Sequence, residues 1–204
     1  VPYKWAVMSC TQAAGLSLRW LRDVCCAPET EEAKARGIDP YVVMSDYASS
    51  VPIGADRLLY LPYLMGERSP HLDPHARGVF IGLSAVHKRA HLIRAVMEGV
   101  AFSQRECVDV FRELGVEIND MMMCGGGARN LLWRQMLADL YGTGVSTIQP
   151  EGGAALGAAI LAGVGTGVFN SVPEACDAVI QKNETCPAIS ENSAKYEPYY
   201  AIYR

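Results

Sequence analysis

The sequence lacks the features of several large protein classes. Its 18 basic and 22 acidic residues give a net charge of −4, and no basic stripe with interleaved aromatic residues suggests nucleic-acid binding. No apolar run is long enough to span a bilayer, and the chain does not start with a charged-then-apolar signal pattern. We therefore expect neither a nucleic-acid partner nor a membrane partner.

Cysteine and histidine are present, but not in the patterns that form disulfides or bind metals. The seven cysteines are an odd number and include no CxxC pair, which favours reduced thiols in a cytoplasmic protein over a disulfide framework. The four histidines lie between residues 71 and 91, but no cysteines or carboxylates accompany them in the pattern of a metal site. The sequence therefore predicts no bound metal.

The composition is that of a globular protein with a substantial core, because 50% of the 204 residues are hydrophobic and 20% are charged. Segments with the apolar pattern of strands alternate along the chain with segments that have the pattern of helices, which predicts an α/β layer architecture. The expected strands are residues 3–8, 58–61, 118–124 and 145–148, and the expected helices are residues 11–25, 41–49, 88–114, 131–141, 152–162 and 171–180.

The centre of this pattern is an apolar run that stops abruptly at Gly125, Gly126 and Gly127 and is followed by a helix ending before Gly142. Glycines remove side chains from the approach to a ligand, and the free amides of a helix start favour polar or anionic groups. Glycine is also a common turn former. The triplet alone therefore leaves both a ligand site and a plain turn open.

Residues 62–83 form a long connection rich in glycine, proline and charge. Such a connection inside a compact domain is usually functional. The alternative is a surface excursion held by an ion pair from Glu67 to Arg68 or Arg77. In the longest predicted helix, Glu98 lies beside the apolar stripe; it either orients a site or, as we favour, has a satisfied structural role.

Small residues at two places in the chain predict close packing of the backbone. Gly99 interrupts the longest predicted helix, which indicates a close helix contact. Residues 152–162 are mostly glycine and alanine, so this helix can lie very close to another element. Neither stretch offers chemistry of its own.

Three motifs occur in order along the chain. Residues 61–70 read LPYLMGERSP, residues 78–98 contain GVFIGL, a seven-residue gap and HLIRAVME, and residues 125–135 read GGGARNLLWRQ. Together they resemble the C-terminal half of the FGGY family of carbohydrate kinases, and within it the xylulokinases most closely. A dinucleotide-binding turn is disfavoured, because Asn130 stands where the GxGxxG pattern needs its last glycine.

The resemblance implies an actin-like, ribonuclease-H-like ATPase fold. Residues 1–204 would be a single, partial C-terminal domain, with its first strands and the N-terminal sugar-binding domain absent. The family uses ATP and Mg²⁺, and the implied reaction converts D-xylulose, a ketopentose, to D-xylulose 5-phosphate. Ribulose, gluconate and glycerol remain alternative substrates, and a non-catalytic nucleotide-binding or assembly module remains an alternative class.

The resemblance gives roles to few positions. Gly126 and Gly127 would lie against the adenosine of ATP, and Asn130 would offer its amide to the adenine. Glu67 and Arg68 would shape the interdomain cleft or hinge. The family's catalytic aspartate and phosphate-binding turns have no counterpart here, so we expect no catalytic residue in this chain and no activity from it alone. An open sheet edge would allow pairing with a second copy as a homodimer.

Overall fold

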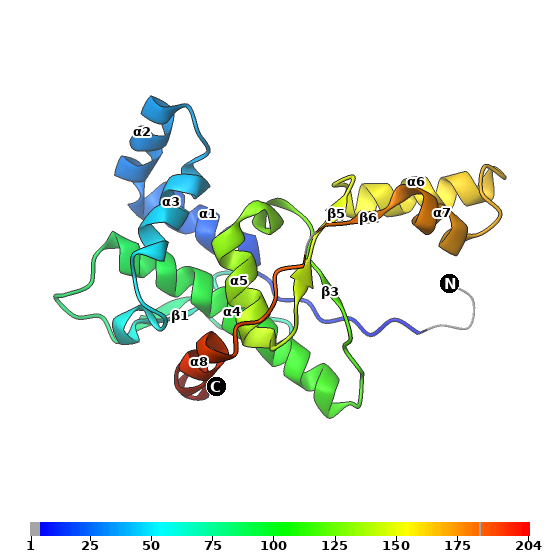
Figure 1. Ribbon diagram of the computed structural model, residues 1–204. Coiled ribbons are helices and arrows are strands. Elements are labelled where there is room, and N and C mark those ends of the chain that lie inside the picture. The colour runs from blue at the N-terminus through cyan, green and yellow to red at the C-terminus, as the bar shows by residue number, and fades with distance from the viewer. Residues whose placement is uncertain (1–4, 184) are drawn as a thin grey trace.

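Helix α4 (Arg89–Glu113) is the centre of the fold, and four other helices pack against it (Figure 1). The computed structural model describes residues 5–183 and 185–204. Apolar residues recur along α4 at helical spacing, and the side chains of Ile93, Val96 and Phe102 are fully buried in the core. The predicted helix over residues 88–114 is therefore confirmed.

Five other helices surround α4 or cover its neighbours. They are α1 (Ala14–Cys25), α2 (Ala27–Arg36), α3 (Pro40–Ser49), α5 (Leu131–Tyr141) and α8 (Ser190–Tyr203). Helices α1, α3, α5 and α8 contact α4, whereas α2 lies on α1 and α3. The start of α3 follows from its sequence, because Asp39 Oδ1 accepts a hydrogen bond from Tyr41 N at 2.8 Å and Pro40 occupies the first turn.

The strands are short and form three separate pairs. Strand β1 (Leu59–Leu61) runs antiparallel to β2 (Val79–Ile81), with Tyr60 opposite Phe80. Strand β3 (Met121–Met122) runs parallel to β4 (Val145–Ser146), and β5 (Ile148–Gln149) runs antiparallel to β6 (Gln181–Lys182). The chain also contains two 3₁₀ turns, η1 (Ala55–Arg57) and η2 (Gly126–Arg129).

Three predicted strands differ from the structure. The strand expected over residues 145–148 is divided into β4 and β5, which pair with different strands. The strand expected over residues 118–124 is reduced to β3, and the prediction of a strand over residues 3–8 is wrong for Trp5 to Met8, which carry no regular structure. Residues 3 and 4 lie outside the described part of the chain. A strand needs a neighbour for its backbone hydrogen bonds, and none of the described strands pairs with residues 5–8.

Gly99 allows α4 to lie directly on β1. A Cβ atom at this position would lie 2.1 Å from the carbonyl oxygen of Tyr60, a separation that only glycine permits. The predicted close contact of this helix is confirmed.

The neighbouring Glu98 belongs to a buried polar network. Its Oε1 accepts from Arg94 Nε at 2.6 Å and from Gly54 N at 3.1 Å, and Arg94 Nη2 donates to Tyr196 OH at 2.8 Å. Burial raises the pKa of Glu98, while the charge of Arg94 opposes that shift. Because these bonds join α4, α8 and the turn before η1, they support the structural role that we favoured for Glu98.

Helix α8 closes the core with one tyrosine face. Tyr196, Tyr200 and Tyr203 are buried, and the ring of Phe102 lies 5.3 to 6.1 Å from theirs, centroid to centroid. Tyr200 OH donates to Asp109 Oδ2 at 2.7 Å, and the hydroxyls of Tyr203 and Tyr63 lie 3.3 Å apart. These contacts dock the tyrosine face of α8 on the body.

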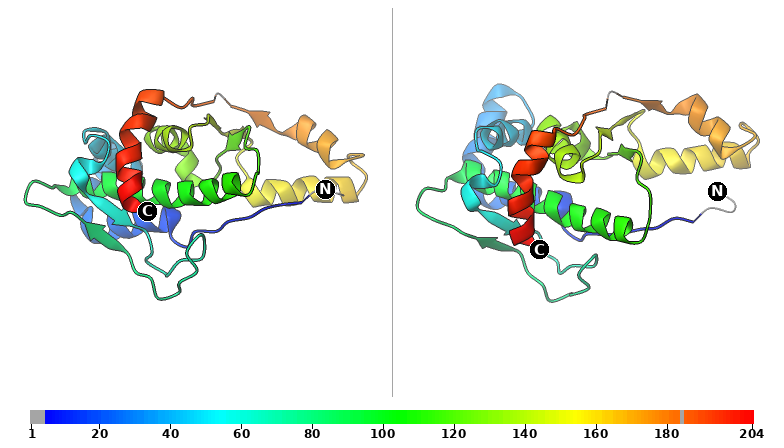
Figure 2. Two further views of the ribbon diagram at one scale, coloured as in Figure 1. Left: turned by 90° about the horizontal axis from the view of Figure 1, so that it is seen from below. Right: turned by 60° about the horizontal axis from the view of Figure 1, so that its bottom comes forward.

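Residues 148–182 form an arm that extends from this body (Figures 1 and 2). The arm consists of β5, α6 (Gly153–Gly165), α7 (Val172–Val179) and β6. Helix α6 packs on α7, and Ile160 is its one buried residue. The expected close packing of this small-residue helix is thus limited to one neighbour. Within residues 5–183 and 185–204, every helix is too short or too polar to cross a membrane.

Candidate functional site

The candidate site begins where β3 runs into the glycine turn. Met123 N donates to Ser146 O at 2.8 Å, which continues the pairing of β3 with β4 by one residue. Gly125 then adopts φ +82°, a left-handed value that favours glycine. The turn η2 follows directly, and Gly142 in the left-handed conformation ends α5 as predicted. The strand–turn–helix expected from the sequence is therefore present.

Asn130 joins the glycine turn to two helices. Its Oδ1 accepts a hydrogen bond from Trp133 N at 3.1 Å, so the side chain caps the start of α5. Its Nδ2 donates to Ser45 Oγ of α3 at 2.5 Å. An amide has two N–H donors and two acceptor lone pairs. One N–H and one lone pair of Asn130 thus remain for a ligand, and the residue is partly exposed.

The two predicted glycine contacts differ in their surroundings. A Cβ atom at Gly126 would have no atom within 4 Å, so the space in front of this residue is open. A Cβ atom at Gly127 would lie 3.2 Å from Met123 Cε and 3.6 Å from the Trp133 ring. Gly126 therefore leaves room for a ligand close to the backbone, whereas Gly127 is small because side chains of the domain itself pack against it.

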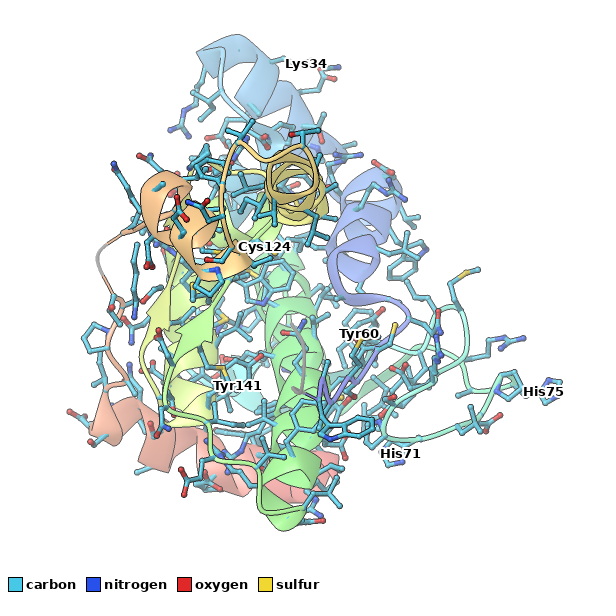
Figure 3. The ribbon with its side chains drawn as sticks, turned by 90° about the vertical axis from the view of Figure 1, so that its right-hand side faces the viewer. Lys34, Tyr60, His71, His75, Cys124 and Tyr141 are labelled. Atoms are coloured by element: carbon cyan, nitrogen blue, oxygen red, sulfur yellow. The ribbon has the colours of Figure 1, made fainter. Side chains whose placement is uncertain are left out.

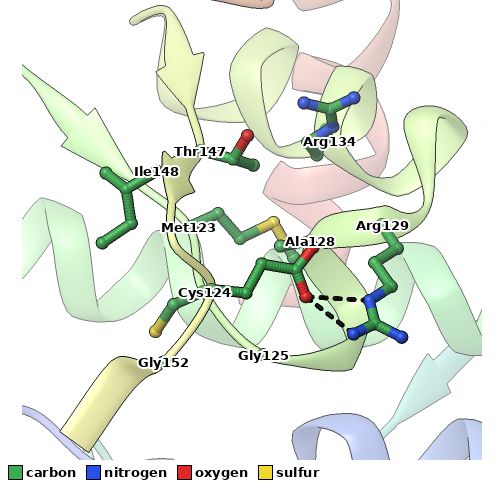
Figure 4. A pocket seen from close by; sticks show the side chains of 10 residues that line it. Met123, Cys124, Gly125, Ala128, Arg129, Arg134, Thr147, Ile148 and Gly152 are labelled. Atoms are coloured by element: carbon green, nitrogen blue, oxygen red, sulfur yellow. Dashed lines mark hydrogen bonds and ion pairs between the residues drawn. The ribbon is translucent and has the colours of Figure 1, made fainter. Parts of the chain in front are cut away.

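A cavity of about 160 Å³ lies beside the turn, toward the arm (Figure 4). Arg129 donates from Nε and Nη2 to Glu151 Oε2 at 3.0 and 2.7 Å, which joins η2 to the start of α6. This pairing raises the pKa of Arg129. The cavity is lined by Met123, Cys124, Gly125, Ala128, Arg129, Arg134, Thr147, Ile148, Glu151 and Gly152.

Most of this lining was missed from the sequence. Thr147, Ile148 and Glu151 belong to no recognised motif, and only the pairing of strands places them beside the turn. Gly126 and Asn130 do not line the cavity. The hollow thus lies on the arm side of the turn, apart from Gly126 and from Asn130, which meets α3.

Glu67 and Arg68 lie apart from the glycine turn. Glu67 is 3% exposed, and its Oε1 accepts from Gln12 N at 3.0 Å and from Arg68 N at 2.7 Å. In the same connection, His71 Nε2 lies 3.2 Å from Glu106 Oε1. Figure 3 shows this histidine well removed from Cys124. The Glu67 carboxylate thus fastens the connection to the body by accepting from the backbone N–H of Gln12. In the described residues it forms no ion pair with Arg68 or Arg77, and Arg77 donates instead to Pro74 O and Ala76 O.

Comparisons with known proteins agree with this arrangement. The model of the FGGY family of carbohydrate kinases, C-terminal domain, matches residues 1–166. The chain is 39% identical to the xylulose kinase of Bacillus subtilis over 197 residues, which are 97% of this chain and 38% of that protein. It is 37% identical to the gluconokinase of Bacillus licheniformis, over 94% of this chain and 37% of that protein.

Solved structures give the same result. The crystal structure of xylulose kinase from Rhodospirillum rubrum matches with a TM-score of 0.79 and 33% identity, over 96% of this chain and 38% of that one. The chain thus spans well under half the length of the relatives it matches. The expected fold class, the actin-like ATPase fold of these sugar kinases, is confirmed. The chain belongs to the FGGY family of carbohydrate kinases and carries the family's C-terminal domain.

Proposed function

We propose that this chain is the nucleotide-binding C-terminal part of an ATP-dependent kinase that phosphorylates D-xylulose to D-xylulose 5-phosphate. Family membership supports a sugar kinase, and similarity to xylulose kinases supports the substrate. The observation that carries the nucleotide role is the open space at Gly126, in the turn that ends at the partly exposed Asn130. Gluconate is the second candidate substrate, because a gluconokinase is 37% identical to the chain.

In this proposal the chain supplies one half of the ATP site. Gly126 lets the nucleoside lie against the backbone, and Asn130 offers its remaining N–H and lone pair to the adenine edge. ATP, when bound with Mg²⁺, supplies the phosphoryl group, whose transfer requires positioning and charge stabilisation more than covalent help. We assign no ligand of Mg²⁺ and no catalytic base to this chain, so catalysis depends on residues outside it.

The remaining expectations belong to the same proposal. The kinase is cytoplasmic, and Glu67 and Arg68 shape the cleft or hinge of the complete enzyme. Gly126 and Gly127 lie against the adenosine, as the resemblance implies. The free edge of β3, which pairs with β4 alone among the described strands, supports association with a second copy.

Calorimetric titration of the chain with ADP and Mg²⁺ tests the nucleotide role. We expect weak binding that Gly126→Leu abolishes, because the added side chain occupies the open space and its Cβ atom meets no other atom within 4 Å. Gly157→Leu is the matched control, since a Cβ atom there also meets no atom within 4 Å, but in the arm. Folded chain that fails to bind at millimolar ADP, or a Gly126→Leu variant that binds normally, would contradict the proposal.

The substrate requires the complete enzyme. Comparing kcat/KM for D-xylulose, D-ribulose, gluconate and glycerol tests the preference directly. A higher kcat/KM for any sugar or polyol other than D-xylulose would replace the substrate in this proposal and leave the nucleotide role standing.

A further inference from the structure

Ser45 lies on α3 and is bonded to the amide of Asn130, although 85 residues separate them in sequence. Its hydroxyl has one hydrogen, which it donates to Tyr41 O of its own helix at 2.8 Å. The oxygen of Ser45 must therefore accept the second bond, and Asn130 Nδ2 donates it. The amide nitrogen of Asn130 is thus directed toward α3.

The other end of the amide is fixed independently. The backbone N–H of Trp133 can only donate, so the atom that it meets at 3.1 Å is Asn130 Oδ1. Two separate constraints, one from α3 and one from α5, assign the same orientation. A flip of the amide would place its oxygen against an accepting hydroxyl and its nitrogen against an N–H donor.

This fixed orientation has a consequence for a nucleobase. Asn130 keeps one N–H as a donor and one lone pair as an acceptor for a ligand. On its N1 edge, adenine places the N6 amino donor beside the N1 acceptor. Guanine has the reverse order on that edge, with the O6 acceptor in place of the amino donor and an N1–H donor in place of the acceptor. For a base held in one pose, an amide that cannot turn therefore pairs fully with adenine and places like groups against guanine.

We propose that Ser45 is a positioning residue of the nucleotide site, which locks the Asn130 amide in the orientation that selects adenine over guanine. The inference rests on the proposed function and adds base selectivity to it. Ser45 acts only through Asn130. A purely structural pin between α3 and α5 would affect stability and would leave base selectivity unchanged.

The test is calorimetric titration of the chain with ADP and with GDP, each with Mg²⁺. We expect Ser45→Ala to weaken ADP binding about fivefold and to reduce the ADP-to-GDP preference, because a typical hydrogen bond is lost and only the bond from Trp133 N then opposes a turn of the amide. Ser45→Thr keeps the hydroxyl and should keep the preference. Ser49→Ala is the control on the same helix, since that exposed hydroxyl bonds only Asp46 O, at 2.7 Å.

The outcomes separate the two proposals. An ADP-to-GDP preference that is the same in Ser45→Ala and in the unsubstituted chain contradicts the role of Ser45 and leaves the proposed function intact. An unsubstituted chain that binds neither nucleotide contradicts the proposed function, and base selection by this chain with it.

A measurement without ligand tests the lock itself. Solvent exchange of the Asn130 side-chain amide, followed by NMR, should become faster in Ser45→Ala and stay slow in Ser45→Thr and Ser49→Ala. Equal exchange in all four proteins would show that Ser45 does not hold the amide.

Discussion

Helices α4 and α6 show that apolar composition alone does not decide burial in this chain. Helix α4 carries charged residues along its length, and yet Arg94 and Glu98 are 5% and 1% exposed. Helix α6 contains no charged residue, and yet Leu161 is 62% exposed and only Ile160 is buried. The difference lies in the neighbours, because α4 is covered by other elements on most sides and α6 by α7 alone.

The comparison separates two sources of helix stability. In α4, tertiary packing dominates, so substitutions act through clashes and through unpaired buried groups. In α6, little surface is buried on either side, so intrinsic helix propensity has the larger share. Three substitutions test this division, from the largest expected effect to the smallest.

Glu98→Ala should give the largest effect. Removing one partner of a buried ion pair leaves Arg94 uncompensated in the core, which typically costs about 3 to 5 kcal/mol. Urea unfolding would measure the change in the free energy of unfolding. Glu31→Ala on α2 is the control, because its pair with Lys34 is exposed and worth about 1 kcal/mol at most. Equal effects of the two substitutions would remove the distinction drawn for α4.

Gly99→Ala should give an intermediate loss. The added Cβ atom would lie 2.1 Å from Tyr60 O, so α4 and β1 must move apart. We expect a cost of about 1 to 3 kcal/mol, as for overpacked cores, seen as a lower Tm. Gly15→Ala in α1, where a Cβ atom meets nothing within 4 Å, should not lower the Tm. An unchanged Tm for Gly99→Ala would show that the contact yields easily.

Gly157→Ala should give the smallest effect, and of opposite sign. The position is exposed, a Cβ atom there meets nothing, and alanine favours the helix by about 0.5 to 1 kcal/mol. Amide hydrogen exchange in α6 should slow by about two- to fivefold as the helix opens less often. Faster exchange would mean that α6 is packed more tightly than its exposure indicates.

Six helices were predicted well because their signals are local. Asp39 and Pro40 mark the start of α3, and Gly142 marks the end of α5. The strands at residues 3–8 and 118–124 were predicted less well, because a strand exists only with a neighbour that local patterns do not reveal.

The candidate site divides in the same way. Gly126 and Asn130 were found because a contiguous motif contains them, and their contact with adenosine stays a prediction. Ser45 was not found, because its relation to Asn130 arises only when α3 packs beside the glycine turn. Ala55, Asp56 and Arg57 all have positive φ values without being glycine. Nothing in their residue types indicates this, since such values are uncommon for side-chain-bearing residues.

The tyrosine face of α8 has a consequence for the order of assembly during synthesis. Its hydroxyls meet Tyr63, Arg94 and Asp109, which precede their partners by 140, 102 and 91 residues. A growing chain therefore cannot complete this core until residues 196–203 have left the ribosome. Until then the aromatic ring of Phe102 and its apolar neighbours are exposed to solvent. Such a surface on a nascent chain is prone to aggregation and is a target of chaperones. Closing such long loops also makes folding slow.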